Sequence, residues 1–181
     1  MAEFRHETER LILRDWREED REPFAVMCAD GDVMRHFPAT LSRNESDALI
    51  DRINTHIDEH GFGLWAMERT KDGALLGFTG IQFVRLESPI LGDVEIGWRL
   101  DKRHWGKGYA REAAEASLDW FWRNTDHDRV VSMTISDNEP SWGLMQRIGL
   151  ERRPNLDFDH PGIEAGTRYC RQIVYAKDRN S

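Results

Sequence analysis

The sequence predicts a single domain, residues 1–181, with a mixed α/β fold in which helices flank a mostly antiparallel central sheet. Three strand-like runs follow one another closely at residues 63–68, 74–85 and 94–100, which is typical of an antiparallel meander. Strand and helix patterns then alternate to the end of the chain. No repeat, low-complexity segment or linker divides the sequence, so one hydrophobic core is expected.

The first part of the chain is expected to form one strand and two helices. Residues 10–16 alternate between apolar and polar side chains, as a strand does. The first helix begins near Arg17, ends at the turn 30–32 and carries the apolar residues Phe24, Val26 and Met27. The second follows Ser42 and Asn44, ends at Gly61 in a C-cap position and repeats apolar residues at helical spacing, at Ala48, Leu49, Ile53 and Ile57.

The second part of the chain predicts two further helices between strands. A helix after residue 108 presents one face that begins with small residues and consists of Ala110, Ala113, Ala114, Ser117, Leu118 and Phe121. Residues 130–135 are apolar and β-branched, as in a buried strand. Asp137 or Asn138 can cap the next helix, which ends at Gly149 and shares a face made of Trp142, Met145 and Ile148. A final strand is expected at residues 169–175, after turn-rich residues 157–166.

Composition argues against several classes of function. A net charge of −8 disfavours broad contact with nucleic-acid backbones, because such binding needs basic surfaces. No apolar run approaches the roughly 18 residues that span a bilayer, so no membrane partner is expected. Cys28 and Cys170 lie far apart without metal-ligand spacing, and we expect both to be packing residues of a cytoplasmic protein.

Residues 103–108 contain two glycines between a predicted strand and a predicted helix. Unpaired backbone N–H groups and the positive end of the helix dipole meet at such a loop, which makes it an anion site. Between Arg99 and Arg111 there are five basic residues against one acid, and a small polyanionic ligand would explain this local charge. A G-x-G loop by itself is also found in simple tight turns, so the neighbouring motifs have to decide.

Three ordered motifs make the interpretation specific: VEIGWRL at residues 94–100, WGKGYAREA at 105–113, and the stretch from NEPS to IGL at 138–150. With them the chain resembles the GCN5-related N-acetyltransferases (GNAT), and within these the branch of ribosomal-protein-alanine N-terminal acetyltransferases. The resemblance covers about residues 8–177. It implies that strands 94–100 and 130–135 splay apart and that the pantetheine arm of acetyl-CoA enters the gap.

The resemblance also implies which residues hold acetyl-CoA, with no metal required. Backbone groups of Trp98 and Leu100 would bond the pantetheine amides. The pyrophosphate would be held by a loop that consists of Arg103, Trp105, Gly106, Lys107, Gly108, Tyr109 and Ala110. The Lys107 side chain would add charge, unless it is a solvated lysine at a loop tip. Asn138 matches the asparagine that contacts the cofactor arm in the family, although it could serve only as a helix cap.

Transfer of an acyl group from a thioester to an amine needs a base, an oxyanion donor and a proton source. Glu95 lies on the strand beside the gap, opposite the apolar face, and would act as the base through water if desolvation raised its pKa. An ion pair with Arg99 is the structural alternative. A backbone N–H near Gly97 or Trp98 would meet the oxyanion, because a mid-strand glycine often marks a bulge or a close backbone approach.

The proton source and the acceptor site are less clearly indicated by the sequence. Many relatives place a tyrosine where this chain has Met145, which cannot donate a proton. Ser141 matches a serine of the resembling branch and is the candidate acid, although a first-turn serine can equally bond the helix backbone. His160, beside Asp159, is a hypothesis for acceptor binding or deprotonation, and a surface turn is the alternative.

Three other functions compete with this interpretation. His56, Glu59 and His60 fit the H-x-x-E-H pattern of inverted zinc metallopeptidases, or they form the wet face of a helix. A dinucleotide-binding oxidoreductase would need a small residue in place of Arg111. A non-catalytic module that binds CoA or a protein partner would keep the fold without turnover.

The acceptor amine is left open. A protein N-terminus, a free amino acid, a polyamine and an amine-bearing antibiotic all offer the same nucleophile. A negative protein attracts cationic acceptors, which is compatible with polyamines or basic peptides. A monomer or a homodimer is expected, on base rates alone.

Overall fold

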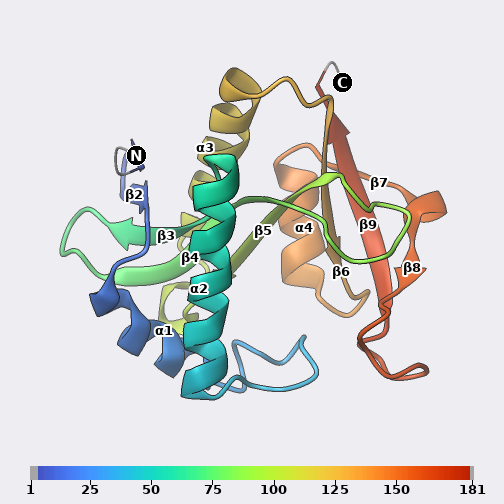
Figure 1. The fold of residues 1–181 in the computed structure, drawn as a ribbon, viewed down its shortest axis with the longest axis horizontal. Coiled ribbons are helices and arrows are strands. Elements are labelled where there is room, and N and C mark those ends of the chain that lie inside the picture. The colour runs from blue at the N-terminus through green and yellow to red at the C-terminus, as the bar shows by residue number, and fades with distance from the viewer. Residues whose placement is uncertain (1–3, 180–181) are drawn as a thin grey trace.

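The structure is a computed structural model that describes residues 4–179, and it contains one open sheet with helices on both faces (Figure 1). The strand order is β1-β2-β3-β4-β5-β6-β9-β7, and β8 also pairs with β9. The nine strands of the described residues are β1 (Arg5–Glu7), β2 (Leu11–Arg14), β3 (Leu64–Arg69), β4 (Leu75–Phe83), β5 (Val94–Leu100), β6 (Arg129–Thr134), β7 (Glu151–Arg152), β8 (Phe158–Asp159) and β9 (Arg171–Asp178).

Along the sequence, the helices lie between these strands. Four α-helices occur within residues 4–179: α1 (Arg21–Cys28), α2 (Arg43–His60), α3 (Tyr109–Asn124) and α4 (Glu139–Arg147). The same residues form three short 3-10 helices: η1 (Glu18–Asp20), η2 (Lys102–His104) and η3 (Pro154–Leu156). Each predicted helix is present, and the last strand begins two residues later than predicted.

Most neighbouring strands run antiparallel. Strands β1 to β5 form a meander, and β6 and β9 pair antiparallel beyond it. Strands β5 and β6 are parallel, because α3 returns the chain to the end of the sheet where β5 began. The predicted mixed α/β fold with a mostly antiparallel sheet is confirmed, while the short strands β1, β7 and β8 lie outside the predicted elements.

The parallel pair β5–β6 separates after two residues. Val94 pairs with Val130 and Glu95 with Val131, and no register continues beyond them in the described strands. The hydroxyl of Ser132 donates to the carbonyl of Ile96 at 2.9 Å, at the point where the strands part. On its other edge β6 stays paired with β9 along its whole length. The sheet therefore contains an opening in its middle, as the splayed arrangement requires.

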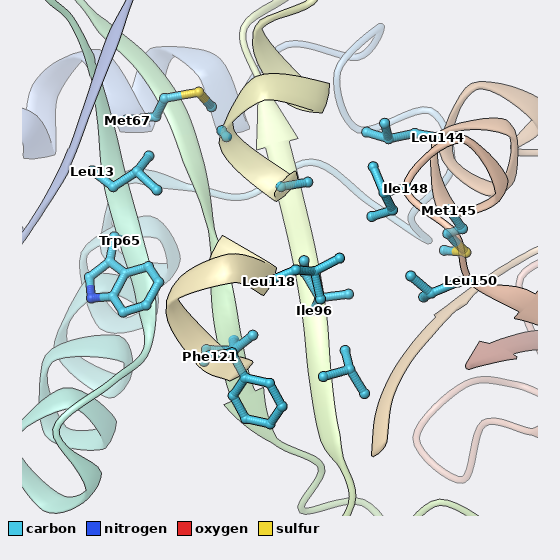
Figure 2. Packing of buried hydrophobic residues seen from close by; sticks show 14 of the residues in the cluster. Leu13, Trp65, Met67, Ile96, Leu118, Phe121, Leu144, Met145, Ile148 and Leu150 are labelled. Atoms are coloured by element: carbon cyan, nitrogen blue, oxygen red, sulfur yellow. The ribbon is translucent and has the colours of Figure 1, made fainter. Parts of the chain in front are cut away.

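Two layers of helices cover the sheet. Helices α3 and α4 pack on one face, where Leu118 and Phe121 of α3 meet Trp65 and Ile96 of the sheet (Figure 2). Helices α1 and α2 cover the other face, with a core that contains Phe24, Met27, Ile50, Ile53, Ala66 and Phe78. The face of β5 that carries Val94, Ile96 and Leu100 belongs to the α3 layer. The alternate residues of β5 therefore point toward the α1 and α2 layer.

Helix α2 ends at Gly61 as predicted, begins at Arg43, one residue before Asn44, and buries a face that overlaps the predicted one only in part. Ser42 accepts from the Glu45 amide in a reciprocal capping box, and Gly61 ends the helix with φ of 76°. The fully buried residues are Ser46, Ile50, Ile53 and His56. Of the predicted stripe, Leu49 and Ile57 are half-buried against this core, whereas Ala48 is exposed. The prediction that both histidines lie on the wet face is wrong for His56, because hydrogen bonds to both of its ring nitrogens replace those to water.

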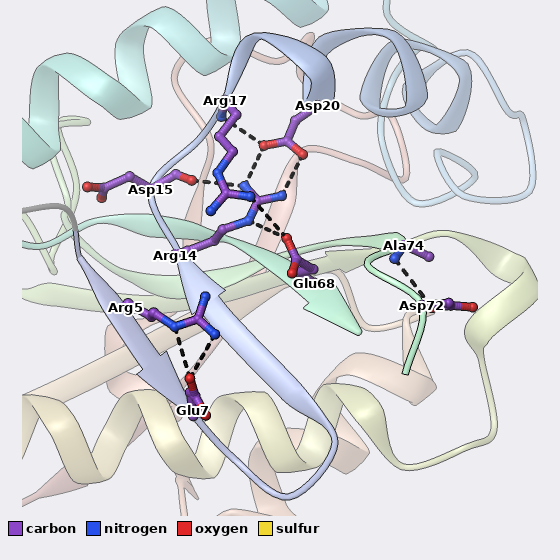
Figure 3. Close-up of polar contacts among 9 residues, drawn as sticks. All are labelled: Arg5, Glu7, Arg14, Asp15, Arg17, Asp20, Glu68, Asp72 and Ala74. Atoms are coloured by element: carbon purple, nitrogen blue, oxygen red, sulfur yellow. Dashed lines mark hydrogen bonds and ion pairs between the residues drawn. The ribbon is translucent and has the colours of Figure 1, made fainter. Parts of the chain in front are cut away.

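A buried ion-pair cluster joins β2 to β3 and to η1. Arg14 at the end of β2 is 2% exposed and donates to Asp20 at 2.6 Å and to Glu68 of β3 at 2.7 Å (Figure 3). Asp20 also accepts from the backbone N–H of Arg17 at 2.8 Å. Because a buried charge without a partner costs several kcal/mol, on the order of 3–5, loss of one partner would destabilise this corner.

Two further features concern the length of the helices and the state of the cysteines. Within residues 4–179 no helix is both long enough and apolar enough to cross a membrane. Cys28 in α1 and Cys170 before β9 are both buried and free, and Cys28 belongs to the core under α1 and α2.

Candidate active site

A pocket of about 940 Å³ runs along the opening between β5 and β6. We call the part beside η2 and α3 the loop end, lined by His104, Trp105, Gly106, Gly108, Tyr109, Ala110 and Arg111. One wall is formed by β6 and α4 and includes Ser132, Thr134, Asn138, Ser141 and Leu144. We call the part lined by the loop after α1, β4, β5 and the segment before β9 the α1 end; its residues include Arg35, His36, Phe37, Phe78, Gln82, Glu95, Arg99, His160, Tyr169 and Gln172. The two parts meet where the Arg35 guanidinium lies 5.5 Å from the centre of the Trp105 ring.

The loop end is built from backbone. Gly106 and Gly108 adopt φ of 70° and 80°, a left-handed conformation that favours glycine, and Gly108 is the N-cap of α3. Glu112 is the first residue of α3 whose amide bonds back, to the Gly108 carbonyl at 3.1 Å. Within the described chain no protein acceptor contacts the amides of residues 106–111. These free N–H groups and the helix dipole together form an anion site.

A distant segment holds this loop in place. Glu112 accepts from the Thr8 hydroxyl at 2.6 Å, from the Arg10 amide at 2.8 Å and from the Arg10 Nε at 2.7 Å. Arg10 also donates to the Lys107 carbonyl at 2.9 Å, and its guanidinium lies 4.6 Å from the centre of the Tyr109 ring. Sequence reasoning missed these residues, because partners about a hundred positions apart leave no local pattern.

The basic side chains around the loop are mostly neutralised within the protein. Arg103 pairs with Asp101 at 2.6 Å, and these hydrogen bonds hold the pKa of Asp101 below its usual value. The ammonium of Lys107 donates to the Arg103 carbonyl at 2.7 Å. Neither of these basic side chains lines the pocket. Lys102 and Arg111 also have acidic partners, so the local positive charge is explained largely without a polyanionic ligand.

Glu95 reaches the floor of the pocket from β5. Its carboxylate accepts a hydrogen bond from Gln82 Nε2 at 3.2 Å, across the register pair that joins β4 and β5. Burial disfavours the charged form and raises the pKa of Glu95 to about 7. No ion pair joins Glu95 to Arg99 or to another cation among residues 4–179. The alternative of a carboxylate paired with Arg99 is therefore wrong.

Gly97 continues β5 without a bulge. The register with β4 runs unbroken from Val94 to Leu100, so the expected irregularity at this glycine is not found. A Cβ at Gly97 would meet only the Leu64 side chain, at 3.9 Å. The glycine instead leaves open space on the face that carries Glu95. The bulge-like positions lie on β4, where Gly77 and Gly80 adopt φ of 140° and 143° against neighbouring backbone.

Two polar residues at the N-terminus of α4, Asn138 and Ser141, line the pocket. Asn138 does not cap the helix with its side chain, and its Nδ2 donates instead to the Thr134 hydroxyl at 2.9 Å. The Ser141 hydroxyl has no hydrogen-bond partner within the described residues, so it does not bond the helix backbone. Met145 is 1% exposed and belongs to the core. Both predicted α4 residues therefore face the pocket, and both structural alternatives are wrong.

The family follows from a comparison with known domains: the description "Acetyltransferase (GNAT) domain" matches residues 10–151 of the chain. The chain belongs to the GNAT family of acetyltransferases. A curated relative, the uncharacterized N-acetyltransferase YnaD of Bacillus subtilis, is 26% identical over 171 residues, which cover 93% of this chain and 94% of the relative. GNAT domains use acetyl-CoA as the acyl donor.

Solved structures share the fold over nearly the whole GNAT chain. A GNAT-family acetyltransferase from Bacillus anthracis has a TM-score of 0.78 at 23% identity, covering 98% of this chain and 100% of the other. The ribosomal-protein-S5-alanine acetyltransferase from Vibrio fischeri has a TM-score of 0.70 at 15% identity, covering 98% of each chain. At these identities the likeness concerns the fold, and the matched family description establishes membership.

The α1 end of this GNAT pocket is closed by two loops that sequence reasoning did not bring together. Arg168 donates to the Arg35 carbonyl at 2.8 Å and so joins the loop after α1 to the segment before β9. His160 lies in that segment and lines the pocket, while Asp159 pairs with Arg171 outside it. His160 Nδ1 accepts from the Gly162 amide at 3.1 Å, so a neutral His160 carries its proton on Nε2.

The zinc-peptidase motif of the sequence serves the core of the GNAT fold. His56 Nδ1 donates to the Phe62 carbonyl at 2.9 Å, and His56 Nε2 accepts from the Phe83 amide at 3.1 Å. Burial lowers the pKa of His56, which favours this neutral form. Glu59 pairs with Arg85 at 2.9 Å. Neither ring nitrogen of His56 is left for a metal, and the described residues contain no cluster of three or more metal-ligating side chains.

Proposed function

We propose that this GNAT domain transfers an acetyl group from acetyl-CoA to a primary amine by direct attack within a ternary complex. The observation that carries the proposal is that one continuous pocket joins an anion site to a carboxyl group whose pKa is about 7. The loop end would hold the CoA phosphates, and the α1 end would hold the amine. A pKa near neutrality suits a group that must take up a proton at physiological pH.

Glu95 is the proposed base. An amine in water is mostly an ammonium, which has no lone pair for attack, so a proton must leave before the C–N bond forms. Glu95 would accept this proton through water on the open face of β5. Gln82, its hydrogen-bond partner, would orient the carboxylate.

The backbone N–H of Trp98 is the proposed oxyanion donor. Ser132 donates to the Ile96 carbonyl from the β6 side, whereas Thr79 donates to the Gly97 carbonyl from the β4 side, at 3.3 Å. Since successive peptide groups of a strand point to opposite edges, the Trp98 N–H faces the opening and the Gly97 N–H does not. Of the two expected positions, Trp98 is therefore the one proposed to meet the oxyanion, and its carbonyl, on the same edge of β5, is proposed to bond the pantetheine arm.

The backbone of Leu100 is also proposed to bond the pantetheine arm. The Leu100 carbonyl accepts from the Trp105 indole N–H at 2.9 Å, which ties the end of β5 to the glycine loop. Its second lone pair is free for a pantetheine amide. Within the loop, we propose that Trp105, Gly106, Lys107, Gly108, Tyr109 and Ala110 act through their backbone, and Arg103 through its ion pair with Asp101.

Ser141 is the proposed partner of the departing thiolate. Its hydroxyl faces the pocket from the first turn of α4, where the helix dipole stabilises negative charge. When the C–S bond breaks, the hydroxyl would donate to the sulfur and lower the cost of the charge. Asn138, held by Thr134, would contact the cofactor arm beside it.

The test measures release of CoA thiol and formation of the N-acetyl product over a broad panel of amines, alongside CoA binding by calorimetry. We expect CoA binding together with thiol release above the hydrolysis background, and an equal amount of acetylated amine. CoA binding without release for every amine would overturn the proposal and leave a binding module with the same fold.

A further inference from the structure

The α1 end of the pocket contains an arginine without a carboxylate partner. Arg99 lies on β5 and lines the pocket, with its guanidinium 4.6 Å from the Phe37 ring centre and 5.4 Å from that of Phe78. Its Nη1 donates to Cys28 Sγ at 3.3 Å. Its Nε is buried and has no hydrogen-bond partner among the described residues. A guanidinium carries five N–H donors, so most of its capacity is left for a ligand.

Arg99 differs in this respect from the arginines around the loop end. Arg10 pairs with Glu112, Arg103 with Asp101, and Arg111 with Glu115. No aspartate or glutamate within residues 4–179 forms an ion pair with Arg99. Two aromatic rings and a thiol compensate only part of the cost of desolvating a charge. An anionic ligand group would supply the missing partner.

Arg99 and Glu95 are placed so that one ligand can contact both. The two residues are four apart on one strand, so they share a face, and their Cα atoms lie about 13 Å apart. Gly97 lies between them with open space above its Cα. A ligand that lies along this face can therefore present one end to Glu95 and the other to Arg99.

Other charges at the α1 end agree with an anionic ligand. Arg35 turns its Nε to His36 at 3.2 Å rather than to an acid, and Arg168 binds the Arg35 carbonyl. Burial and these two arginines lower the pKa of His36. Asp32 in the lining is paired with Lys102, and Asp137 opposes the effect of the two arginines on the pKa of His36 only in part. Despite the net charge of −8, this part of the pocket therefore disfavours binding of a polycationic acceptor.

We infer that Arg99 binds a carboxylate or phosphate on the acceptor, so that the substrate is an amine that also carries an anionic group. The inference rests on the proposed acetyl transfer and names the acceptor class for the same site. Arginine suits this task because its planar fork donates two parallel hydrogen bonds to such anions. The group acts in binding and takes no part in the bond changes at the thioester.

The experiment compares matched amines in the thiol-release assay. One series contains glycine, β-alanine, 4-aminobutyrate and 6-aminohexanoate, the second their primary amides, and the third aminoalkyl phosphates of the same lengths. At the best length we expect kcat/KM to be at least about tenfold higher for an anionic amine than for its amide, since hydrogen bonds between charged groups are strong. The first and third series distinguish carboxylate from phosphate recognition, and the chain lengths measure the distance from Glu95.

The variant Arg99→Met keeps a long side chain between the two rings but removes the charge. We expect the kcat/KM of this variant for the anionic amine to fall to that for the amide, so that the ratio of the two values approaches one. Arg99→Lys should keep part of the preference, because it retains charge without the fork. Arg123→Gln is the matched control, since Arg123 is an exposed residue of α3 outside the pocket lining.

Four outcomes separate this inference from the proposed function. Equal rates for acids and amides in the unmodified protein would overturn the inference even if Arg99→Met failed to fold. A raised KM for acetyl-CoA with unchanged acceptor preference in Arg99→Met would also overturn it, because Arg99 would then serve the donor. Thiol release from no amine would refute acetyl transfer instead. In that event calorimetry with 6-aminohexanoate and the CoA-bound chain decides, since the inference requires binding that Arg99→Met abolishes.

Discussion

The two ends of the pocket recognise their ligands in different ways. The loop end offers backbone N–H groups from one continuous segment, 106–111, whose shape depends on two glycines. The α1 end offers side chains from four separate segments, namely the loop after α1, β4, β5 and the residues before β9. Recognition by backbone can be retained while side chains change, so the loop end suits a donor that is common to the family. The α1 end can differ between chains, and it is where acceptor choice would be made.

The largest expected effect concerns Glu95, the proposed base, which lines the α1 end. Glu95→Gln keeps the shape and the contact with Gln82 but removes the base, so kcat should fall by about 10²–10⁴-fold. Because the carboxylate must be ionised to act, kcat/KM of the unmodified protein should rise with pH and level off above about pH 7. Steady-state kinetics between pH 5.5 and 9 measure both effects.

CoA affinity should be the same in Glu95→Gln and in the unmodified protein, since the loop end is untouched. The exposed Glu151, replaced by glutamine, is the matched control for loss of one carboxylate. A Glu95→Gln variant that kept its rate and its pH profile would show that Glu95 is not the base.

The second expected effect is on stability, because burial of the ionised Glu95 carboxylate destabilises the folded protein. The folded-state pKa of Glu95 is raised from 4.5 to about 7, so the folded protein holds this proton more tightly than the unfolded chain. Stability from this group is fully present below about pH 4.5 and is lost as the pH rises through 7. At pH 8 Glu95→Gln should therefore unfold with a free energy about 2 kcal/mol higher than the unmodified protein.

Urea unfolding at pH 5 and pH 8 tests this effect. The difference between Glu95→Gln and the parent should be small at the lower pH and large at the higher. A difference that does not change with pH would mean that the glutamate is not destabilised by burial. Glu151→Gln should show no such pH dependence, because Glu151 is exposed.

What could be predicted from the sequence follows the same division of the molecule. Some features are local signals in the sequence, namely the caps of α2 at Ser42 and Gly61 and the glycines of the loop. Each of these residue types is favoured by the backbone conformation at its own position. The burial of His56 depends on an amide of β4 and on a carbonyl of the turn before β3. The helical periodicity of the sequence carries no information about these partners. The partners of Arg99 come from α1, β4 and the loop after α1, so its exposure to a ligand becomes visible only in the fold.

The third expected effect separates donor from acceptor recognition. Gly106 has φ of 70° and open space where a Cβ would lie, so Gly106→Ala acts through the backbone alone, at a cost of about 1–2 kcal/mol. The KM for acetyl-CoA should rise about tenfold, equally for all amines, while acceptor preference stays the same. Gly31→Ala is the matched control, because Gly31 has equal space and an ordinary φ. A changed acceptor preference in Gly106→Ala would contradict the proposal that the loop end binds the donor and the α1 end selects the acceptor.

The smallest expected effect belongs to Ser141, on the wall between the ends. Ser141→Ala removes one hydrogen bond to the thiolate, so kcat should fall by about 3- to 10-fold while CoA affinity and acceptor preference stay unchanged. Ser136→Ala is the control, because the Ser136 hydroxyl contacts Asp137 and lies outside the pocket lining. If Ser141→Ala instead weakened CoA binding without lowering kcat, Ser141 would belong to donor recognition, and the helix dipole of α4 alone would be left to stabilise the leaving thiolate.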